Sequence, residues 1–409
     1  MKEDIDRLMG SEGLDAILIL GPARHNPDMY YFTGGGHVSS GALLLRRGQP
    51  GLLHCYPMER DEAALSGLQV KFFAPIADLL EQTDGDLLEA EAMQVQQLLE
   101  GAGVTSGRLA IGGISDLGPI LGIIPVLSKA LPDLTISGLP RDSVIREAMA
   151  TKDGDEIERI RRMGSITTEV VDNIADFLSG HHAREGVLVN GGGRVLTIGD
   201  VKHRINRELV ERGAENPHGS IFAAGRDAGV PHSAGADASP VPAGETIVFD
   251  IFPCEEGGGY FYDFTRTWCL GNAPDEALSL YQDVIEVYQE VVSKLEPDAL
   301  CEPYQDLTCE LFEARGHPTV RTDSYTNDGY THSLGHGLGL YVHELPHFGQ
   351  LATEKDVLAP GAVFTIEPGL YYPERGMGVR LENTYHVGKD GVIGPLAEYP
   401  LDLVLPLSQ

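Results

Sequence analysis

The segment 332–346, HSLGHGLGLYVHELP, constrains the fold of this chain more than any other. Three of the fourteen histidines, His332, His336 and His343, lie within twelve residues of it, separated mainly by glycines and aliphatic residues. Glycine permits close backbone approach and positive φ, so imidazoles beside it can face a site with little bulk behind them. The segment therefore predicts histidines directed into a common site.

An acid-bearing hairpin is expected on the N-terminal side of these histidines. An apolar strand at 246–249 reaches Asp250, and a turn of three glycines follows at 257–259. The return strand carries Asp263 and, three residues later, Arg266. The hairpin thus places one acid at the end of an apolar strand and another on its partner.

A second hairpin of the same design is expected on the C-terminal side. Its apolar strand at 362–366 reaches Glu367, and its return strand at 378–383 carries Arg380 and Glu382. The two hairpins look like copies of one another. Together they would bring four carboxylates to one place.

The four acids need counter-charges, because a carboxylate among apolar residues suffers a large desolvation penalty when it is unpaired. The nearby arginines could neutralise two of the four. Two divalent cations would balance all four, and the imidazole of His336 would complete the ligand set. Any one of these acids, taken alone, is more simply interpreted as a strand-end residue facing solvent. The ordered set Asp, Asp, His, Glu, Glu favours a metal site.

These residues resemble the metal ligands of the creatinase/aminopeptidase P/prolidase family of pita-bread metallohydrolases, in which the ligands occur in the same order. One departure lies in the first hairpin, where thirteen residues separate the two aspartates and the family usually has slightly fewer. The extra length falls at the hairpin tip and should lengthen the turn only. The matching segments are Asp250 with 263–266, 332–336, 342–344, 365–369 and 379–383.

The resemblance implies two divalent metal ions per chain. Manganese is expected first, with cobalt, zinc or iron as alternatives that also suit an oxygen-rich set of ligands. Carried over position by position, Asp250 would bind one ion, and His336 with Glu367 would bind the other. Asp263 and Glu382 would bridge both.

The resemblance also implies catalytic roles. Glu367 would move the proton of a metal-bridging hydroxide, which is the nucleophile. His343 and His332 would stabilise the tetrahedral intermediate and the leaving group, and His232 would line the substrate pocket. Arg380 would orient the carboxylate two residues after it, since both side chains leave the same face of a strand.

The activity implied is removal of an N-terminal residue that precedes proline, from a dipeptide or from a longer peptide. Two alternatives remain open. One is creatinase-like hydrolysis of a small C–N substrate without metal, and the other is a catalytically inactive binding module on the same fold. Both are disfavoured because all five ligands are present.

A different metal motif, H-E-x-x-H, occurs at 343–347. In zinc proteases this motif lies on an uninterrupted helix that places both histidines on one face. Pro346 has no backbone N–H, and its ring clashes with a preceding helical turn. The segment is therefore expected to be extended, which argues against a zinc-protease site.

Two domains are expected in 409 residues. Residues 1–145 alternate short buried strands with helices and predict an α/β domain of the creatinase type. It carries no catalytic set and is interpreted as a scaffold that shapes the cleft and builds a homodimer. Its expected strands are 16–20, 42–45 and 51–55, and its expected helix is 87–100.

Residues 150–409 predict an α+β catalytic domain with the pita-bread fold. Asp153 and Glu156 form a capping-box pattern, and apolar residues at helical spacing follow until Ser179. The adjacent His181 and His182 are expected in a solvated loop. Further helices are expected at 276–295 and 304–314, packed over a curved, largely antiparallel sheet.

The net charge limits the possible binding partners of this chain, and the cysteine pattern limits its cellular compartment. With 30 basic and 61 acidic residues, the formal charge is −31, which disfavours nucleic acid and anionic membranes as partners. The charged N-terminus shows no signal-peptide pattern. The five cysteines show no C-x-x-C spacing, which suits a reducing cytoplasm. A cytoplasmic enzyme with a peptide or dipeptide substrate is expected.

Overall fold

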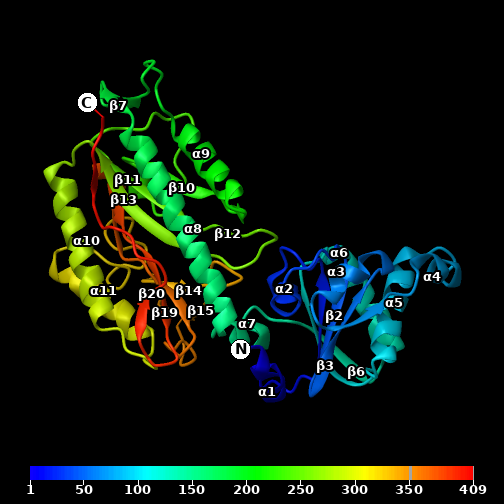
Figure 1. The fold of residues 1–409 in the computed structure, drawn as a ribbon. Helices are drawn as coiled ribbons and strands as arrows, with labels where there is room; N and C mark the ends of the chain where they lie inside the picture. Colours follow the sequence, from blue (N-terminus) through cyan, green and yellow to red (C-terminus); the bar gives the residue numbers. More distant parts are fainter. Residues whose placement is uncertain (350–351, 409) are drawn as a thin grey trace. The chain divides into compact units, whose positions relative to one another are not determined.

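The computed structural model describes residues 1–349 and 352–408, and the chain divides into two compact units (Figure 1). One unit comprises Met1–Met149 with Gly257–Gly259. The other comprises Ala150–Glu256 with Tyr260–Gln409. The glycine turn of the first acid-bearing hairpin thus clusters with the N-terminal unit.

The N-terminal unit is built on a six-stranded mixed sheet with the order β4-β3-β2-β1-β5-β6. Its central strand β1 is apolar and largely buried, as expected for a strand covered on both faces. The strands are β1 (Ala16–Gly21), β2 (Gly41–Arg46), β3 (Gln49–Cys55), β4 (Gln69–Phe72), β5 (Gly107–Gly113) and β6 (Leu134–Gly138). The helices are α1 (Ile5–Ser11), α2 (Pro27–Thr33), α3 (Arg60–Ala64), α4 (Ile76–Gln82), α5 (Leu87–Gly101), α6 (Leu117–Ala130) and α7 (Val144–Met149), with 3-10 turns η1 (Lys2–Asp4) and η2 (Pro57–Glu59).

The second unit begins with the long helix α8 (Gly154–Ser179), which confirms the expected helix. The Asp153 side chain accepts hydrogen bonds from the amides of Asp155 and Glu156, and the Glu156 side chain accepts one from the Asp153 amide. This capping box satisfies backbone donors that a helix start leaves unpaired. Helix α8 packs against α9 (Ile198–Glu211) and against the first of two main sheets.

The first main sheet contains the predicted hairpin. Strands β11 (Thr246–Ile251) and β13 (Phe264–Leu270) pair antiparallel, with Asp250 opposite Thr265. The sheet order is β10-β11-β13-β21, with β10 at Ser220–Ala224 and β21 at Val404–Leu405. Small elements of this unit are β7 (His182–Arg184), β8 (Val187–Val189), β9 (Ala214–Glu215), β12 (Cys254–Glu255), η3 (Asp227–Gly229) and η4 (Pro373–Arg375).

The second main sheet differs from the predicted copy of the first hairpin. Its order is β15-β14-β16-β19-β20, and the partner of β16 (Val363–Ile366) is β19 (Asn383–Val387). The segment between them forms a separate hairpin of β17 (Gly369–Tyr372) and β18 (Met377–Arg380). The expected return strand at 378–383 is therefore wrong as a partner of β16. The remaining strands are β14 (His336–Gly337), β15 (Glu344–His347) and β20 (Ile393–Pro395).

The fully buried Arg266 joins the two main sheets. Its guanidinium donates to the carbonyls of Thr265 and Glu382 at 2.9 Å and to the side-chain oxygen of Asn383 at 2.9 Å. The guanidinium also lies 4.2 Å from the Phe264 ring centroid. A buried charge is tolerated only when its donors are satisfied, so Arg266 fixes the chain just after Glu382 against β13.

Helices α10 (Asp275–Ser293) and α11 (Glu302–Ala314) pack together, and α10 also contacts β17 and β18. Both helices were expected, within two residues at the ends. With the second sheet they enclose a large apolar core that includes Val284, Phe312 and Phe364. The sheets that carry the acids are thereby backed by a rigid layer.

Among the described residues, no helix combines the length and apolarity that crossing a bilayer requires. All five cysteines are buried and carry free thiols. Burial raises the pKa of each of these thiols.

Candidate metal centre

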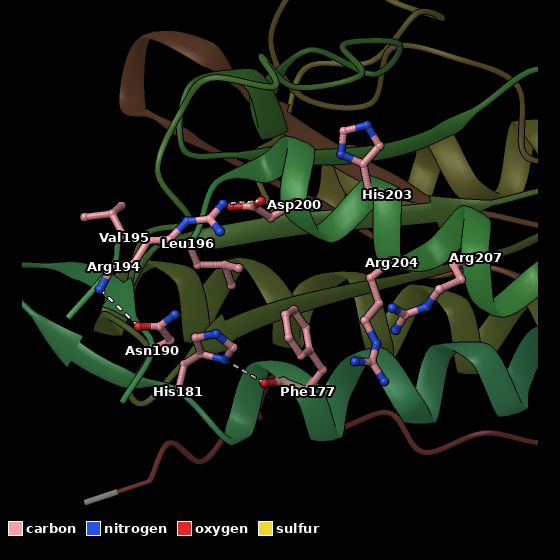
Figure 2. A pocket seen from close by; sticks show the side chains of 10 residues that line it. All are labelled: Phe177, His181, Asn190, Arg194, Val195, Leu196, Asp200, His203, Arg204 and Arg207. Carbon is pink, nitrogen blue, oxygen red and sulfur yellow. Dashed lines mark hydrogen bonds and ion pairs between the residues drawn. The ribbon is translucent and has the colours of Figure 1, made fainter. Parts of the chain in front are cut away.

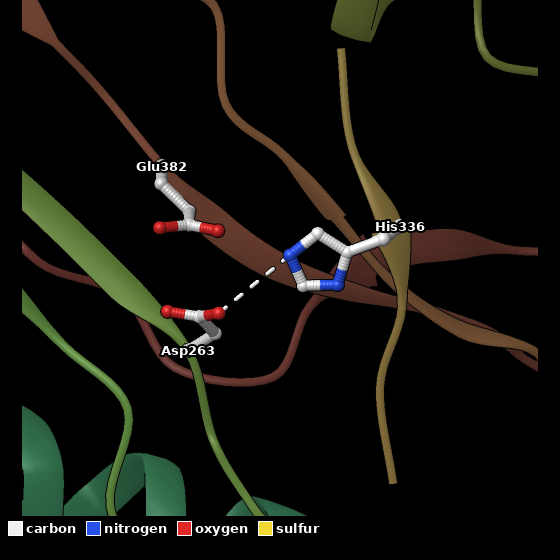
Figure 3. A group of neighbouring side chains, drawn as sticks. All are labelled: Asp263, His336 and Glu382. Atoms are coloured by element: carbon white, nitrogen blue, oxygen red, sulfur yellow. Dashed lines mark ion pairs between the residues drawn. The ribbon is translucent and has the colours of Figure 1, made fainter. Parts of the chain in front are cut away.

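Three of the five predicted ligands converge at the junction of the two main sheets (Figure 3). Asp263 lies just before β13, His336 begins β14, and Glu382 lies between β18 and β19. One potential ligand atom from each lies within 4.8 Å of the others. In Figure 3 the two carboxylates face one another and the imidazole points toward them. His336 Nε2 lies 3.6 Å from Asp263 Oδ2.

The other two predicted ligands border the same group. Glu367 Oε1 lies 3.4 Å from His336 Nε2. Asp250, at the end of β11, is close enough for its charge to raise the pKa of Asp263, Glu367 and Glu382. The chain therefore brings four acids and one histidine from five separate segments into one buried group.

The hydrogen-bonding pattern of these carboxylates is the one expected of side chains that bind cations. Asp250 Oδ1, Asp263 Oδ1 and Glu382 Oε1 are buried, and none has a hydrogen-bond partner among the described residues. Buried carboxylate oxygens normally have partners, so three such atoms in one group indicate an acceptor set meant for cations. Oxygen-rich ligands with one imidazole suit divalent metals such as manganese.

Without a cation the carboxylates repel one another. Burial, reinforced by the charges of Glu382, Asp250 and Glu367, raises the pKa of Asp263 well above its usual range. Burial and the charge of Glu382 do the same for the pKa of Glu367. Burial and the charge of Asp250 raise the pKa of Glu382 to about 8. The set therefore holds protons at neutral pH that a bound cation would displace.

The imidazoles of His332 and His336 are neutral at neutral pH. Burial lowers the pKa of His336 to about 3, and the neighbouring charge of His343 adds to the effect. Burial also lowers the pKa of His332 to about 3, with Arg380 adding to it. Neutral imidazole is the form that binds metal, which suits His336.

His343 and His232 are exposed and lie at the border of the group. The ring centroids of His343 and His336 are 4.3 Å apart in an edge-on arrangement. Partial loss of hydration and the charge of His232 lower the pKa of His343. Charge on His232 acts on His332 as well, so His232 faces the same space although it comes from a different loop.

Arg380 forms its ion pair with Asp250 rather than with Glu382, the partner expected from the sequence. Its Nη2 lies 2.6 Å from Asp250 Oδ2, and both side chains are nearly fully buried. Strand β18 ends at Arg380, so the period-2 argument does not extend to Glu382. Glu382 instead accepts a hydrogen bond of 2.8 Å from the Thr265 hydroxyl.

Tyr371 is a site residue that the sequence interpretation missed. Its hydroxyl accepts a hydrogen bond of 2.9 Å from Arg380 and lies 2.8 Å from His332 Nε2. His332 Nδ1 lies 2.7 Å from the Ser333 carbonyl, which can only accept. The proton of neutral His332 therefore resides on Nδ1, and Tyr371 donates to Nε2. The sequence signal that could have pointed to Tyr371 was Arg380, because a buried arginine needs hydrogen-bond acceptors around it.

Thr265 was also missed, although a signal was available. It follows Asp263 by two residues, and alternate residues of a strand share a face. Its hydroxyl therefore reaches the same group of carboxylates and fixes Glu382.

Four of the five residues of the H-E-x-x-H segment, Glu344–His347, form the strand β15, so the segment is not helical and the expected extended conformation is confirmed. Its two histidines therefore do not have the helical spacing of a zinc protease. Glu344 of this segment is buried and forms an ion pair with Lys152.

Apart from the metal-ligand group, the same unit contains a hollow of about 600 Å³. It is lined mainly by residues of α8, of the segment after β8 and of α9 (Figure 2). Its three arginines each face a carboxylate, which leaves little net charge for a ligand. The pairs are Arg194–Asp200 at 2.7 Å, Arg204–Glu208 at 2.9 Å and Arg207–Glu211 at 3.7 Å. The expectation that His181 is solvated is wrong. Its imidazole is buried here, bonded to the Phe177 carbonyl at 2.8 Å and packed on the Phe177 ring.

The families that match this chain correspond to its division into two parts. Residues 2–114 match the creatinase/prolidase N-terminal domain, and residues 158–389 match metallopeptidase family M24. The Xaa-Pro dipeptidase of Pyrococcus furiosus is 25% identical over 400 residues, which cover 96% of this chain and 97% of that protein. The Xaa-Pro dipeptidase of Pyrococcus horikoshii is 26% identical, with 96% of each chain covered.

Solved structures confirm the fold class. A dipeptidase from Pyrococcus horikoshii superposes with a TM-score of 0.74 at 21% identity, covering 98% of this chain and 99% of the other. The X-Pro aminopeptidase from Thermotoga maritima gives a TM-score of 0.73 at 22% identity, with the same coverage. The predicted architecture, a pita-bread domain with a creatinase-type α/β domain, is therefore correct. The chain belongs to metallopeptidase family M24.

Proposed function

We propose that this metallopeptidase removes the N-terminal residue that precedes proline, from dipeptides or from short peptides. The observation that carries the proposal is the buried group of four acids and one histidine, with three carboxylate oxygens that have no hydrogen-bond donor in the described part of the chain. Full-length similarity to proteins named Xaa-Pro dipeptidase supports the choice of proline substrates.

Membership of family M24 implies divalent metal ions. We propose two per chain, manganese first, with cobalt, zinc or iron as alternatives. Asp250 would hold one ion, His336 and Glu367 the other, and Asp263 and Glu382 would bridge them. When bound, the ions supply a water of lowered pKa and positive charge to stabilise the oxygen on which negative charge develops.

The protein's own groups would bind the peptide and move its protons. The Glu367 carboxylate, whose Oε2 lies 4.0 Å from His332 Nδ1, would accept the proton of the attacking water and pass it to the departing nitrogen. The exposed His343 would donate a hydrogen bond to the carbonyl oxygen of the scissile bond as negative charge builds on it. His232 would line the pocket for the residue next to the bond.

His332 would act through Tyr371, because both of its ring nitrogens already have partners. The Tyr371 hydroxyl is fixed by Arg380 on one side and by His332 on the other. Because the single hydroxyl proton of Tyr371 is donated to His332 Nε2, this arrangement would fix the orientation of both side chains near Glu367 rather than supply a donor to the tetrahedral intermediate. Arg380 would also balance the negative charge of Asp250 through their 2.6 Å contact.

The test is a matched pair of peptides, Xaa-Pro-Ala and Xaa-Ala-Ala, together with the dipeptide Xaa-Pro, assayed with manganese, cobalt and zinc in turn. An Xaa-Pro bond is a tertiary amide whose proline ring fixes φ near about −65°. The proposal predicts cleavage only where proline is second. Equal rates on the first two peptides would indicate a general aminopeptidase. Cleavage of none would bring forward a creatinase-like hydrolase or an inactive binding module.

Three further features are proposed. The cytoplasm is the compartment that suits five buried free thiols. A homodimer is the expected assembly. The domains are proposed at 1–145 for the creatinase-type domain and 150–409 for the catalytic domain.

A further inference from the structure

Lys152 and Glu344 form an ion pair in the interior of the second unit. Lys152 Nζ lies 2.8 Å from Glu344 Oε2, and the side chains are only 2% and 1% exposed. The two residues are 192 positions apart in the chain. Burying both charges carries a desolvation penalty, which the mutual attraction only partly offsets. The pair therefore needs another explanation than stability.

The second oxygen of Glu344 fixes the turn that precedes it. Glu344 Oε1 accepts a hydrogen bond of 3.0 Å from the Tyr341 amide. The carboxylate also packs directly on Gly339, where a Cβ atom would lie 2.5 Å from Oε2. The Gly339 carbonyl in turn accepts a hydrogen bond of 2.8 Å from the Phe261 amide. One carboxylate thus locks the turn 339–343 from its buried side.

Lys152 is itself held in place. Its amide donates to the Gly361 carbonyl at 2.8 Å, and Gly361 has a positive φ of 90°. Lys152 also precedes the capping residue of α8. The ammonium is thereby anchored between the start of α8 and the strand that leads to the metal-ligand group.

His343 is the residue that this anchoring affects. It immediately precedes Glu344, the first residue of β15, and lies in the bend that leads into this strand. Glu344 is buried, whereas His343 is exposed and contacts the His336 ring. An exposed imidazole on a glycine-rich turn has many rotamers and backbone positions unless the turn is fixed from behind.

We propose that the Lys152–Glu344 ion pair positions His343 for the reaction, so that Lys152 and Glu344 are positioning residues of this site. The inference rests on the proposed role of His343. It also assigns a purpose to the glutamate of the H-E-x-x-H segment. A misplacement of about 1 Å in a reacting group can lower the rate about 10²-fold.

The experiment removes both charges together, because a single change would leave one charge buried and unpaired and could prevent folding. The variant is Lys152→Met combined with Glu344→Leu. Lys294→Met serves as the matched control, since Lys294 forms a half-exposed pair with Glu290 at the C-terminal end of α10. Metal content, kcat and KM are measured for each protein on the best Xaa-Pro peptide.

The double variant is expected to keep its metal content, to lose about 10- to 100-fold in kcat and to change KM by less than about twofold. In a His343→Ala background the same double change should alter kcat by less than about twofold, because there is no imidazole left to position. An equal loss of kcat in both backgrounds would overturn the proposal, as would a double variant with native kcat.

A second readout separates this inference from the proposed function. In protein labelled with ¹⁵N-histidine, the His343 signals, assigned through His343→Ala, should shift or broaden in the double variant and not in Lys294→Met. Unchanged His343 signals would overturn the positioning role even in an active enzyme. If the native protein cleaves no Xaa-Pro peptide, the proposed function fails, and these signals still decide whether the ion pair fixes His343.

Discussion

Metal-free protein should become less stable as the pH rises above neutrality. Burial and neighbouring charge raise the folded-state pKa of Glu382 from its ordinary 4.5 to about 8. The folded metal-free protein therefore binds a proton that the unfolded chain has lost. Its free energy of unfolding falls with rising pH until the pH passes the folded-state pKa of Glu382. The raised pKa values of Asp263 and Glu367 act in the same direction.

The pH window for this test is chosen so that the histidines contribute little to the pH dependence of stability. Burial lowers the pKa of His332 and His336 to about 3, so below about pH 6.5 their effect on stability has the opposite sign. Between about pH 6.5 and 8 the carboxylates dominate, and each proton contributes a slope of about 1.4 kcal/mol per pH unit. Glu382 alone should lower the free energy of unfolding by about 2 kcal/mol across this window.

The assay is urea unfolding of chelator-treated protein at several pH values. The single tryptophan, Trp268, is buried in β13, so its fluorescence reports on the catalytic unit. Glu382→Gln is the matched control, because it keeps the shape and removes the titration. Its slope should be smaller by about 1.4 kcal/mol per pH unit. Identical slopes for the two metal-free proteins would refute the reasoning, as would stability that rises through the window.

Three substitutions separate the roles of the site residues. His343→Ala should keep its metal and lose about 10²–10³ in kcat, the range for one lost donor to the developing oxyanion; metal loss in this variant would make His343 a ligand. Asp263→Asn should instead release metal, as measured by elemental analysis, because the ligand loses its charge; full occupancy would exclude the bridging role. Arg380→Met should lower the free energy of unfolding of the metal-free protein by about 3–5 kcal/mol, since Asp250 is left buried and unpaired, and an unchanged urea midpoint would show that the pair contributes nothing.

Features set by local sequence were predictable. The capping box at Asp153 marked the start of α8, and Pro346 excluded a helix at the H-E-x-x-H segment. The acids at the ends of apolar strands indicated a buried charged group, because the apolar pattern predicts burial and burial demands compensation. The structure brings all of the predicted ligands together, and their roles as ligands stay predictions.

Features set by pairing between distant segments were not predictable. Arg380 was expected beside Glu382 because of strand periodicity, but its partner Asp250 is 130 positions away. The second hairpin resembled the first in composition, yet β16 pairs with β19 because β17 and β18 form their own hairpin. Glu344 stood out only as part of the H-E-x-x-H segment, and nothing in the sequence linked it to Lys152, which is 192 positions away.

The most direct test of the metal site is calorimetric titration of metal-free protein with manganese near neutral pH, in buffers of different ionisation enthalpy. The account predicts two ions bound per chain and release of protons, because the raised pKa values of Asp263, Glu367 and Glu382 leave protons to displace. Binding of no ion, or binding without proton release, would contradict it.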